Sequence, residues 1–163
     1  MSGTAFPSTV SQVDTTARFP LGYEVSLPAT KSGALSVTND SGGQIWVYVY
    51  NDSGSTIDAN IAVMRKTSTA YNILIAATGT EPRRIVGVSQ HAIASGSYGF
   101  VLKKGVGTVT ADATVDADKG LITDGSTAGN VSHAASAGDA AYGWTIAGRS
   151  GSGTFSALID CSG

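Results

Sequence analysis

Apolar and polar residues alternate with a period of two along several short stretches of the chain, the pattern of a β-strand with one face toward a core. The clearest case runs through Tyr98, Phe100 and Leu102. Residues 84–104 therefore predict a hairpin of two strands joined by a tight Ser-Gly turn. Residues 107–115 alternate in the same way and predict a separate, half-buried antiparallel strand.

The strongest single strand is predicted over residues 44–50, between two Asn-Asp-Ser-Gly segments whose side chains favour turns. One face of this strand is aliphatic, and the other carries an aromatic row, Trp46, Tyr48 and Tyr50. Both faces therefore need cover. A row of this kind is most often part of a core, and a protein interface and a sugar-stacking platform are the alternatives.

Further short strands are predicted over residues 57–65, 71–76, 121–122, 141–147 and 154–160. The first of these also fits a helical period, but it is short and β-branched. The last two are expected to form a hairpin around a glycine-rich turn. With about a dozen short strands and turns at intervals of roughly 8–12 residues, the sequence predicts an all-β protein, either an antiparallel β-sandwich or a compact β-barrel.

Two of the predicted strands share a motif in which glycine separates two aromatic residues. The motif occurs as Tyr98-Gly99-Phe100 and as Tyr142-Gly143-Trp144. Because glycine has no side chain, a neighbouring backbone or ring can close over its position. We therefore expect both segments to belong to one all-β core.

The first eighteen residues carry few apolar side chains and show no sustained period. They predict an extended N-terminal arm over residues 1–18, which is disordered alone or ordered on a partner. A single all-β domain is expected over residues 19–163, opening at Phe19-Pro20-Leu21-Gly22. The 163 residues are enough for one domain with a substantial core.

Charge is sparse along the chain. Ten Lys and Arg stand against twelve Asp and Glu, which leaves a formal net charge of −2, and 13% of the residues are charged. A surface that binds nucleic acid needs clustered cations, and the longest cationic runs here are pairs. No stretch reaches the roughly 20 apolar residues that cross a bilayer, and the N-terminus lacks the features of a signal peptide. We expect cytoplasmic synthesis and no contact with nucleic acid or membrane.

Residues that often carry catalysis are few and widely spaced. Cys161 is the one cysteine, so it cannot form an internal disulfide, and a buried structural thiol is the favoured interpretation. The histidines, His91 and His133, lie 42 positions apart and outside the usual spacing of metal ligands. An enzyme would need His91, Cys161 and a carboxylate such as Asp160 or Asp112 to converge.

An acidic run, Asp112, Asp116, Asp118 and Asp124, invites a calcium interpretation. The run fails the EF-hand spacing because no glycine stands at its sixth position, and solvated turns with their own hydrogen bonds are favoured. The sequence thus predicts no catalytic residue, no cofactor and no metal site.

Several short motifs follow Phe19-Pro20-Leu21-Gly22 in a distinctive order. They are residues 46–51 (WVYVYN), 86–90 (VGVSQ), 93–101 (IASGSYGFV) with a downstream Gly105, 141–144 (AYGW) and 155–161 (FSALIDC). In this order they resemble small head structural proteins of tailed bacteriophages, over residues 19–161.

The resemblance implies a capsid decoration, or cement, protein without catalytic residues. It would sit on the outer surface of the virion head, bind the major capsid protein, associate as a homotrimer and stabilise contacts between shell subunits. The arm would lie along a neighbouring subunit. The residues expected at an interface are Phe6, Phe19, Trp46, Tyr48 and Tyr50. The alternative is a carbohydrate- or receptor-binding β-module of a phage fibre or tail, which would expose Trp46, Tyr48, Tyr50 or Trp144 in a row.

Overall fold

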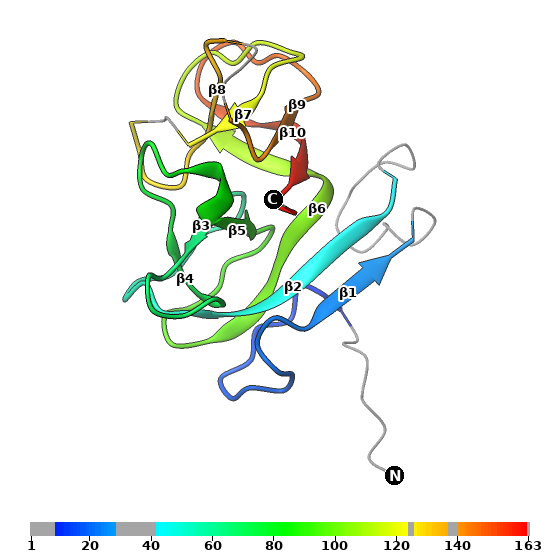
Figure 1. Ribbon diagram of the computed structural model, residues 1–163, viewed down its shortest axis with the longest axis vertical. Coiled ribbons are helices and arrows are strands. Elements are labelled where there is room, and N and C mark those ends of the chain that lie inside the picture. Colours follow the sequence, from blue (N-terminus) through cyan, green and yellow to red (C-terminus); the bar gives the residue numbers. More distant parts are fainter. Residues whose placement is uncertain (1–8, 29–41, 124–125, 137–139, 163) are drawn as a thin grey trace.

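The computed structural model describes residues 9–28, 42–123, 126–136 and 140–162. In these residues the regular structure consists of strands and one turn of 3-10 helix, η3 (Figure 1). No helix among them is long and apolar enough to span a bilayer. The elements are β1 (Glu24–Leu27), β2 (Gln44–Asn51), β3 (Ala62–Arg65), β4 (Asn72–Ile75), η3 (Pro82–Arg84), β5 (Ile85–Val88), β6 (Tyr98–Ala111), β7 (Leu121–Ile122), β8 (Ser132–His133), β9 (Gly143–Thr145) and β10 (Gly153–Asp160).

Five of the strands close into a barrel, in the order β2-β4-β3-β5-β6 and back to β2. The pairs in this ring are antiparallel except β2 and β4, which run parallel. Closure pairs the backbone groups that the edge strands of an open sheet would leave free. The all-β prediction is confirmed, and the barrel is the alternative that forms.

The barrel interior is filled by narrow, mostly β-branched side chains. This cluster draws residues from all five barrel strands, and only the interior of a ring is reached by every strand in it. Ile57 and Ile93 belong to the same cluster and pair at an isolated bridge outside the named strands. The buried members are Val47, Val49, Ile57, Val63, Ile73, Ile93 and Val101.

A second, larger cluster covers the outer side of β2 and β6. It contains the aromatic face of β2, with Trp46 and Tyr48, together with Phe100 of β6. The N-terminal segment and β10 supply the cover, through residues such as Phe19 and Phe155. Both faces of β2 are therefore buried, as the sequence predicts.

The structure describes only the second part of the predicted N-terminal arm. Phe6 and the other residues of 1–8 lie outside them, whereas residues 9–18 lie against the barrel. Val10 is 3% exposed, and Asp14 exchanges two backbone hydrogen bonds with Tyr98, at 2.9 and 2.8 Å. This blue segment passes below β1 and β2 in Figure 1. The packed domain thus begins before Phe19, because Val10 and Asp14 find partners on the barrel.

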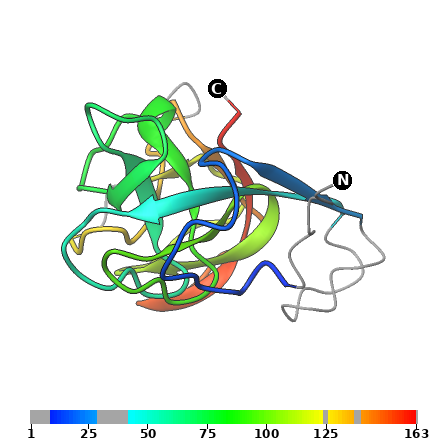
Figure 2. The ribbon, with the colours of Figure 1, turned by 90° about the horizontal axis from the view of Figure 1, so that it is seen from below.

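Beyond the barrel, the second half of β6 pairs with β10, and β10 pairs with β9. The predicted hairpin of residues 141–147 and 154–160 is confirmed as β9 and β10. β7 and β8 form a separate two-stranded sheet. These elements gather at one end of the molecule, at the top of Figure 1, while Figure 2 views the barrel from below.

The hairpin predicted over residues 84–104 forms only in part: β5 and β6 are antiparallel neighbours, and residues 95–96 form the predicted turn. β5 pairs chiefly with β3 and meets β6 at one position, Val88 opposite Leu102. Residues 98–104 and 107–115, predicted as separate strands, instead contribute to the single 14-residue strand β6, which ends at Ala111. Gly105 adopts a φ of 119° within it, a conformation that glycine tolerates, so the strand bends there and continues.

Both glycines of the shared aromatic motif are positions of close approach, as predicted. A Cβ on Gly143 would lie 2.3 Å from the backbone oxygen of Leu158. A Cβ on Gly99 would lie 3.1 Å from Cδ1 of Ile93. In the first case a backbone closes over the glycine, and in the second a side chain does.

Candidate interaction surface

The aromatic row of β2 lies in the chain's own core. Trp46 and Tyr48 have no exposed surface, Phe19 is 7% exposed, and Tyr50 is half-buried. Phe19 meets Tyr48 edge-on, with 5.3 Å between the ring centroids. The row is therefore the surface on which the N-terminal segment packs, and Trp46 and Tyr48 offer neither a partner protein nor a sugar any surface to contact.

A buried hydrogen bond fixes the N-terminal segment to this row. The Tyr48 hydroxyl donates to Oδ2 of Asp14 at 2.8 Å and accepts from the backbone N–H of Arg18 at 3.3 Å. Asp14 Oδ1 also accepts from Nε2 of Gln12 at 3.0 Å. Burial, together with the adjacent Asp14, raises the pKa of Tyr48 to about 12. The hydroxyl therefore keeps its proton at neutral pH and remains a donor.

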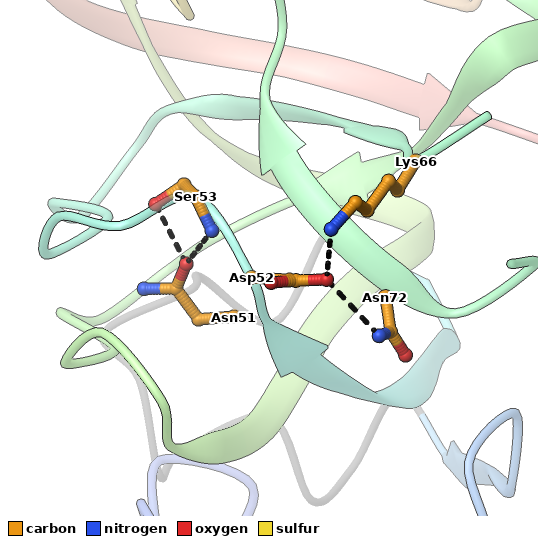
Figure 3. A network of polar contacts seen from close by, with 5 residues as sticks. All are labelled: Asn51, Asp52, Ser53, Lys66 and Asn72. Carbon is orange, nitrogen blue, oxygen red and sulfur yellow. Dashed lines mark hydrogen bonds and ion pairs between the residues drawn. The ribbon is translucent and has the colours of Figure 1, made fainter. Parts of the chain in front are cut away.

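The Asn-Asp-Ser-Gly segment at the end of β2 forms a polar network (Figure 3). Oδ1 of the buried Asn51 accepts from the backbone N–H of Ser53 at 3.0 Å and from its hydroxyl at 2.7 Å. Asp52 accepts from Nζ of Lys66 at 2.7 Å and from Nδ2 of Asn72 at 3.2 Å, and these donors lower its pKa. The predicted turn is confirmed, and its polar groups hold the end of β2 to its neighbours.

Asp112 of the acidic run is held by the segment 126–130, and Asp124 lies outside the described residues. Asp112 accepts from Nδ2 of Asn130 at 2.5 Å, from the backbone N–H of Thr127 at 2.7 Å and from the hydroxyl of Ser126 at 3.1 Å. These donors lower the pKa of Asp112. Among the described residues, no group of three or more His, Cys, Asp and Glu is arranged to hold a metal ion.

His91 and Cys161, which an enzyme would need close together, lie next to different positions of β6. A Cβ on Gly99 would lie 3.4 Å from Nε2 of His91, whereas Cys161 donates its backbone N–H to Lys103 at 3.0 Å. Lys103 lies four positions along the strand from Gly99, a distance of about 13 Å. Burial raises the pKa of the Cys161 thiol to about 12, so the reactive thiolate is scarce at neutral pH.

Three large apolar side chains are exposed together at β9 and β10. Trp144, Ile146 and Leu158 are 53%, 49% and 42% exposed. Trp144 and Leu158 stand opposite each other in the β9–β10 register, and cross-strand neighbours on one face are in contact range. Ile146 lies in the bend just after β9, two residues beyond Trp144. We call these three residues the apolar patch.

The surroundings of the apolar patch are polar. Thr154 and Ser156 occupy the other exposed positions of β10, and Asp160 forms an ion pair with Lys104, with 3.2 Å between Oδ2 and Nζ. An apolar centre with a polar rim is the usual anatomy of a protein interface, and tryptophan is enriched at the centre of such interfaces.

The sequence analysis names Trp144 for the sugar-binding alternative and does not identify Ile146 or Leu158. A signal was present in β10. Its exposed positions are polar except at Leu158, which interrupts an otherwise hydrophilic face. One large apolar residue on a solvent face becomes informative when its cross-strand neighbour is also apolar, and that neighbour is known only from the register.

No family model matches the chain, and no curated protein matches it. Among solved structures, the chain is similar to the crystal structure of the head fiber gp8.5 N base in bacteriophage phi29, with a TM-score of 0.54 and 16% sequence identity. The similarity covers 72% of this chain and 96% of that chain. At this level of identity, the likeness shows a shared fold.

Proposed function

We propose that this chain is a non-enzymatic structural protein of a tailed-phage virion, carried on the outer surface of the head as a decoration, or cement, protein. The observation that carries the proposal is the fold shared with the base of a phage head fiber, which is matched over 96% of its length. The order of sequence motifs supports the same assignment separately. Folds host many functions, so the assignment needs a direct test.

In this proposal the apolar patch is the surface through which copies of the chain associate, as a homotrimer. Permanent homo-oligomeric interfaces are more hydrophobic than transient ones. A patch that contains Trp144, Ile146 and Leu158 is protected from water as soon as copies meet, whereas a patch reserved for the shell would stay exposed until assembly. The second copy is therefore the occupant that this chemistry favours.

The barrel would then bridge major capsid protein subunits from outside, with the N-terminal arm, residues 1–18, adding contacts to a neighbouring subunit. The bonds of Asp14 to Tyr48 and Tyr98 connect this segment to the barrel core. A force on the N-terminal arm would therefore be transmitted to the barrel.

The test has two steps. Light scattering first gives the mass of the purified protein, for which we expect three times the chain mass. The protein is then mixed with DNA-free heads of its own phage and sedimented, and we expect it to sediment with the heads at a fixed ratio to the shell protein. A monomer that remains in the supernatant would overturn the proposal.

Two variants locate the surfaces. Trp144→Ser with Leu158→Ser should yield monomers, because it removes the centre of the apolar patch. Leu21→Ser is the matched control, since Leu21 is 39% exposed and lies outside the patch. Deletion of residues 1–8 should keep the trimer but weaken sedimentation with the heads. An unchanged mass for the patch variant would exclude the patch as the self-association surface.

The exposed Trp144 also favours a second candidate, a carbohydrate-binding module, because sugars stack on exposed aromatic rings. Fluorescence separates this candidate from the first. Trp46 is fully buried, so quenching or a spectral shift on addition of a glycan panel would report Trp144 alone. A glycan-dependent shift that Trp144→Ser abolishes would support the module.

A further inference from the structure

Two arginines without an acidic partner lie side by side at one end of the barrel. Met64 of β3 stands opposite Ile85 of β5 in an antiparallel pair, which places Arg65 next to Arg84, the last residue of η3. Neither guanidinium forms an ion pair or hydrogen bond with any described residue. Like charges at directly opposed strand positions repel each other.

The carboxylates nearby are already engaged. Oε2 of Glu81 lies 2.8 Å from Nη2 of Arg83, and Asp52 is held by Lys66 at 2.7 Å. The fold thus neutralises the two neighbouring cations and leaves the adjacent pair, Arg65 and Arg84, without a counter-charge. An external anion would relieve their repulsion.

Both arginines line one open cavity of about 370 Å³. Three exposed residues of the β3–β4 turn, Thr67, Ser68 and Thr69, bring their hydroxyls to its wall. Guanidinium groups bind planar carboxylates through paired hydrogen bonds, and hydroxyls add neutral donors. The wall is therefore a set of hydrogen-bond donors that suits a carboxylate.

A second cavity of about 160 Å³ adjoins it, since both are lined by Arg65 and Ala70. Its lining includes Tyr71 and Val86, together with Lys103, which is paired with Glu24 at 2.7 Å. We call the two adjoining cavities together the groove; its lining is cationic, with apolar residues in the second cavity, which fits a chain segment better than a single inorganic ion. It also differs from a nucleic-acid site, which needs a run of cations along a backbone.

We propose that this groove binds an acidic segment of a partner protein, with a Glu or Asp carboxylate between Arg65 and Arg84 and a neighbouring apolar side chain against Tyr71. The inference goes beyond the virion role proposed above and does not depend on it. Its test uses the isolated protein, so its failure and the failure of the virion role are separate results.

The probe is the peptide acetyl-Gly-Leu-Glu-Leu-Glu-Gly-amide, titrated into the ¹⁵N-labelled protein and followed by NMR. We expect saturable shifts confined to the amides of residues 65–71 and 84–86. Charge-assisted hydrogen bonds predict that Arg84→Gln and Arg65→Gln each weaken binding about tenfold or more. Arg83→Gln is the matched control, since it removes the same charge from the same turn but from outside the groove, and it should change the affinity about twofold or less.

Three comparison ligands complete the design: the same peptide with Gln in place of Glu, inorganic phosphate, and a short single-stranded oligonucleotide. Each should bind more weakly than the acidic peptide. Equal binding of the Gln peptide, tighter binding of phosphate or the oligonucleotide, or an Arg83→Gln variant that loses as much affinity as Arg84→Gln would each overturn the proposal. The amide spectra of the variants report folding in the same experiment.

Discussion

The hydrogen bond between Tyr48 and Asp14 gives the sharpest test of how the N-terminal segment is held. Tyr48→Phe removes one hydroxyl and keeps the ring, so packing against Phe19 and the rest of the aromatic cluster is retained. What remains is a carboxylate at Asp14 that is 8% exposed and has lost its donor at 2.8 Å. The substitution therefore removes the buried bond to Asp14 together with the longer bond, at 3.3 Å, that the hydroxyl accepts from the backbone N–H of Arg18.

A hydrogen bond to a charged group contributes about 1.5–3 kcal/mol, and an unsatisfied buried partner adds to its loss. We therefore expect Tyr48→Phe to lower the free energy of unfolding by about 2 kcal/mol. With a urea dependence of about 2 kcal/mol per molar, the unfolding midpoint should fall by about 1 M. The amides of residues 10–18 should also exchange with solvent faster than those of β2.

Tyr23→Phe is the matched control. Tyr23 stacks on Phe19 with 5.2 Å between the ring centroids, and its hydroxyl forms no hydrogen bond with a described residue. This variant should stay within about 0.5 kcal/mol of the parent. If Tyr48→Phe also stayed within that range, the buried bond would contribute nothing and the argument for an anchored segment would fail.

The same bond predicts a dependence on alkaline pH. The pKa of Tyr48 is raised from 10.0 to about 12 in the folded protein, so its contribution to stability is complete below pH 10 and is lost as the pH rises toward 12. Burial also raises the pKa of Tyr142 and of Cys161, which contribute to the same alkaline loss. Tyr48→Phe should therefore lose less stability than the parent as the pH rises, and chemical unfolding curves between pH 9 and 12 measure the difference.

Three further predictions concern other parts of the fold. Gly143→Ala should destabilise the protein by roughly 1–3 kcal/mol in chemical unfolding, because the new Cβ would lie 2.3 Å from the backbone oxygen of Leu158. Gly151→Ala is the comparison variant: its Cβ would meet no atom within 4 Å, so it tests only the cost of a positive φ. Alkylation of Cys161 by iodoacetamide at pH 8 should be slowed about a hundredfold or more relative to the urea-unfolded chain, since the thiol pKa is raised to about 12, and equal rates would contradict its burial. The pKa of Asp112 is lowered from 3.8, so its contribution to folding stability is present above that pH and is lost as the pH falls below it. Asp112→Asn should therefore show a smaller fall in stability between pH 5 and 3 than the parent. Asp118→Asn is the control.

The local pattern of the sequence predicted the positions of the two eight-residue strands to within one residue. β2 lies over residues 44–51 against a prediction of 44–50, and β10 over 153–160 against 154–160, because alternation and flanking turn residues are properties of the segment itself. The hairpin predicted over residues 84–104 forms only in part, for a physical reason. A Ser-Gly turn between two apolar runs favours a hairpin, but Ile93 in that connection pairs with Ile57, and β5 finds its longer pairing with β3.

The two tryptophans show that local sequence also does not predict which apolar side chains are exposed. Trp46 and Trp144 both lie in short strands, yet the first is fully buried and the second is 53% exposed. The difference arises because Trp46 belongs to the large buried cluster outside β2 and β6, whereas β10 places Leu158 beside Trp144 and leaves both facing solvent. The adjacency of Arg65 and Arg84 likewise depends on the β3–β5 register.

By itself, the sequence determined that the chain is all-β, where its main strands lie, which turns carry hydrogen-bonding side chains and which glycines must be approached closely. Each of these depends on a few consecutive residues and their side-chain periodicity. Only the tertiary structure decided that the strands close into a barrel, through the parallel contact of β2 with β4 and the antiparallel contact of β2 with β6. Pairing between distant segments is chosen by the free energy of the whole packed chain, so it decides which apolar side chains are covered and which remain available to a partner.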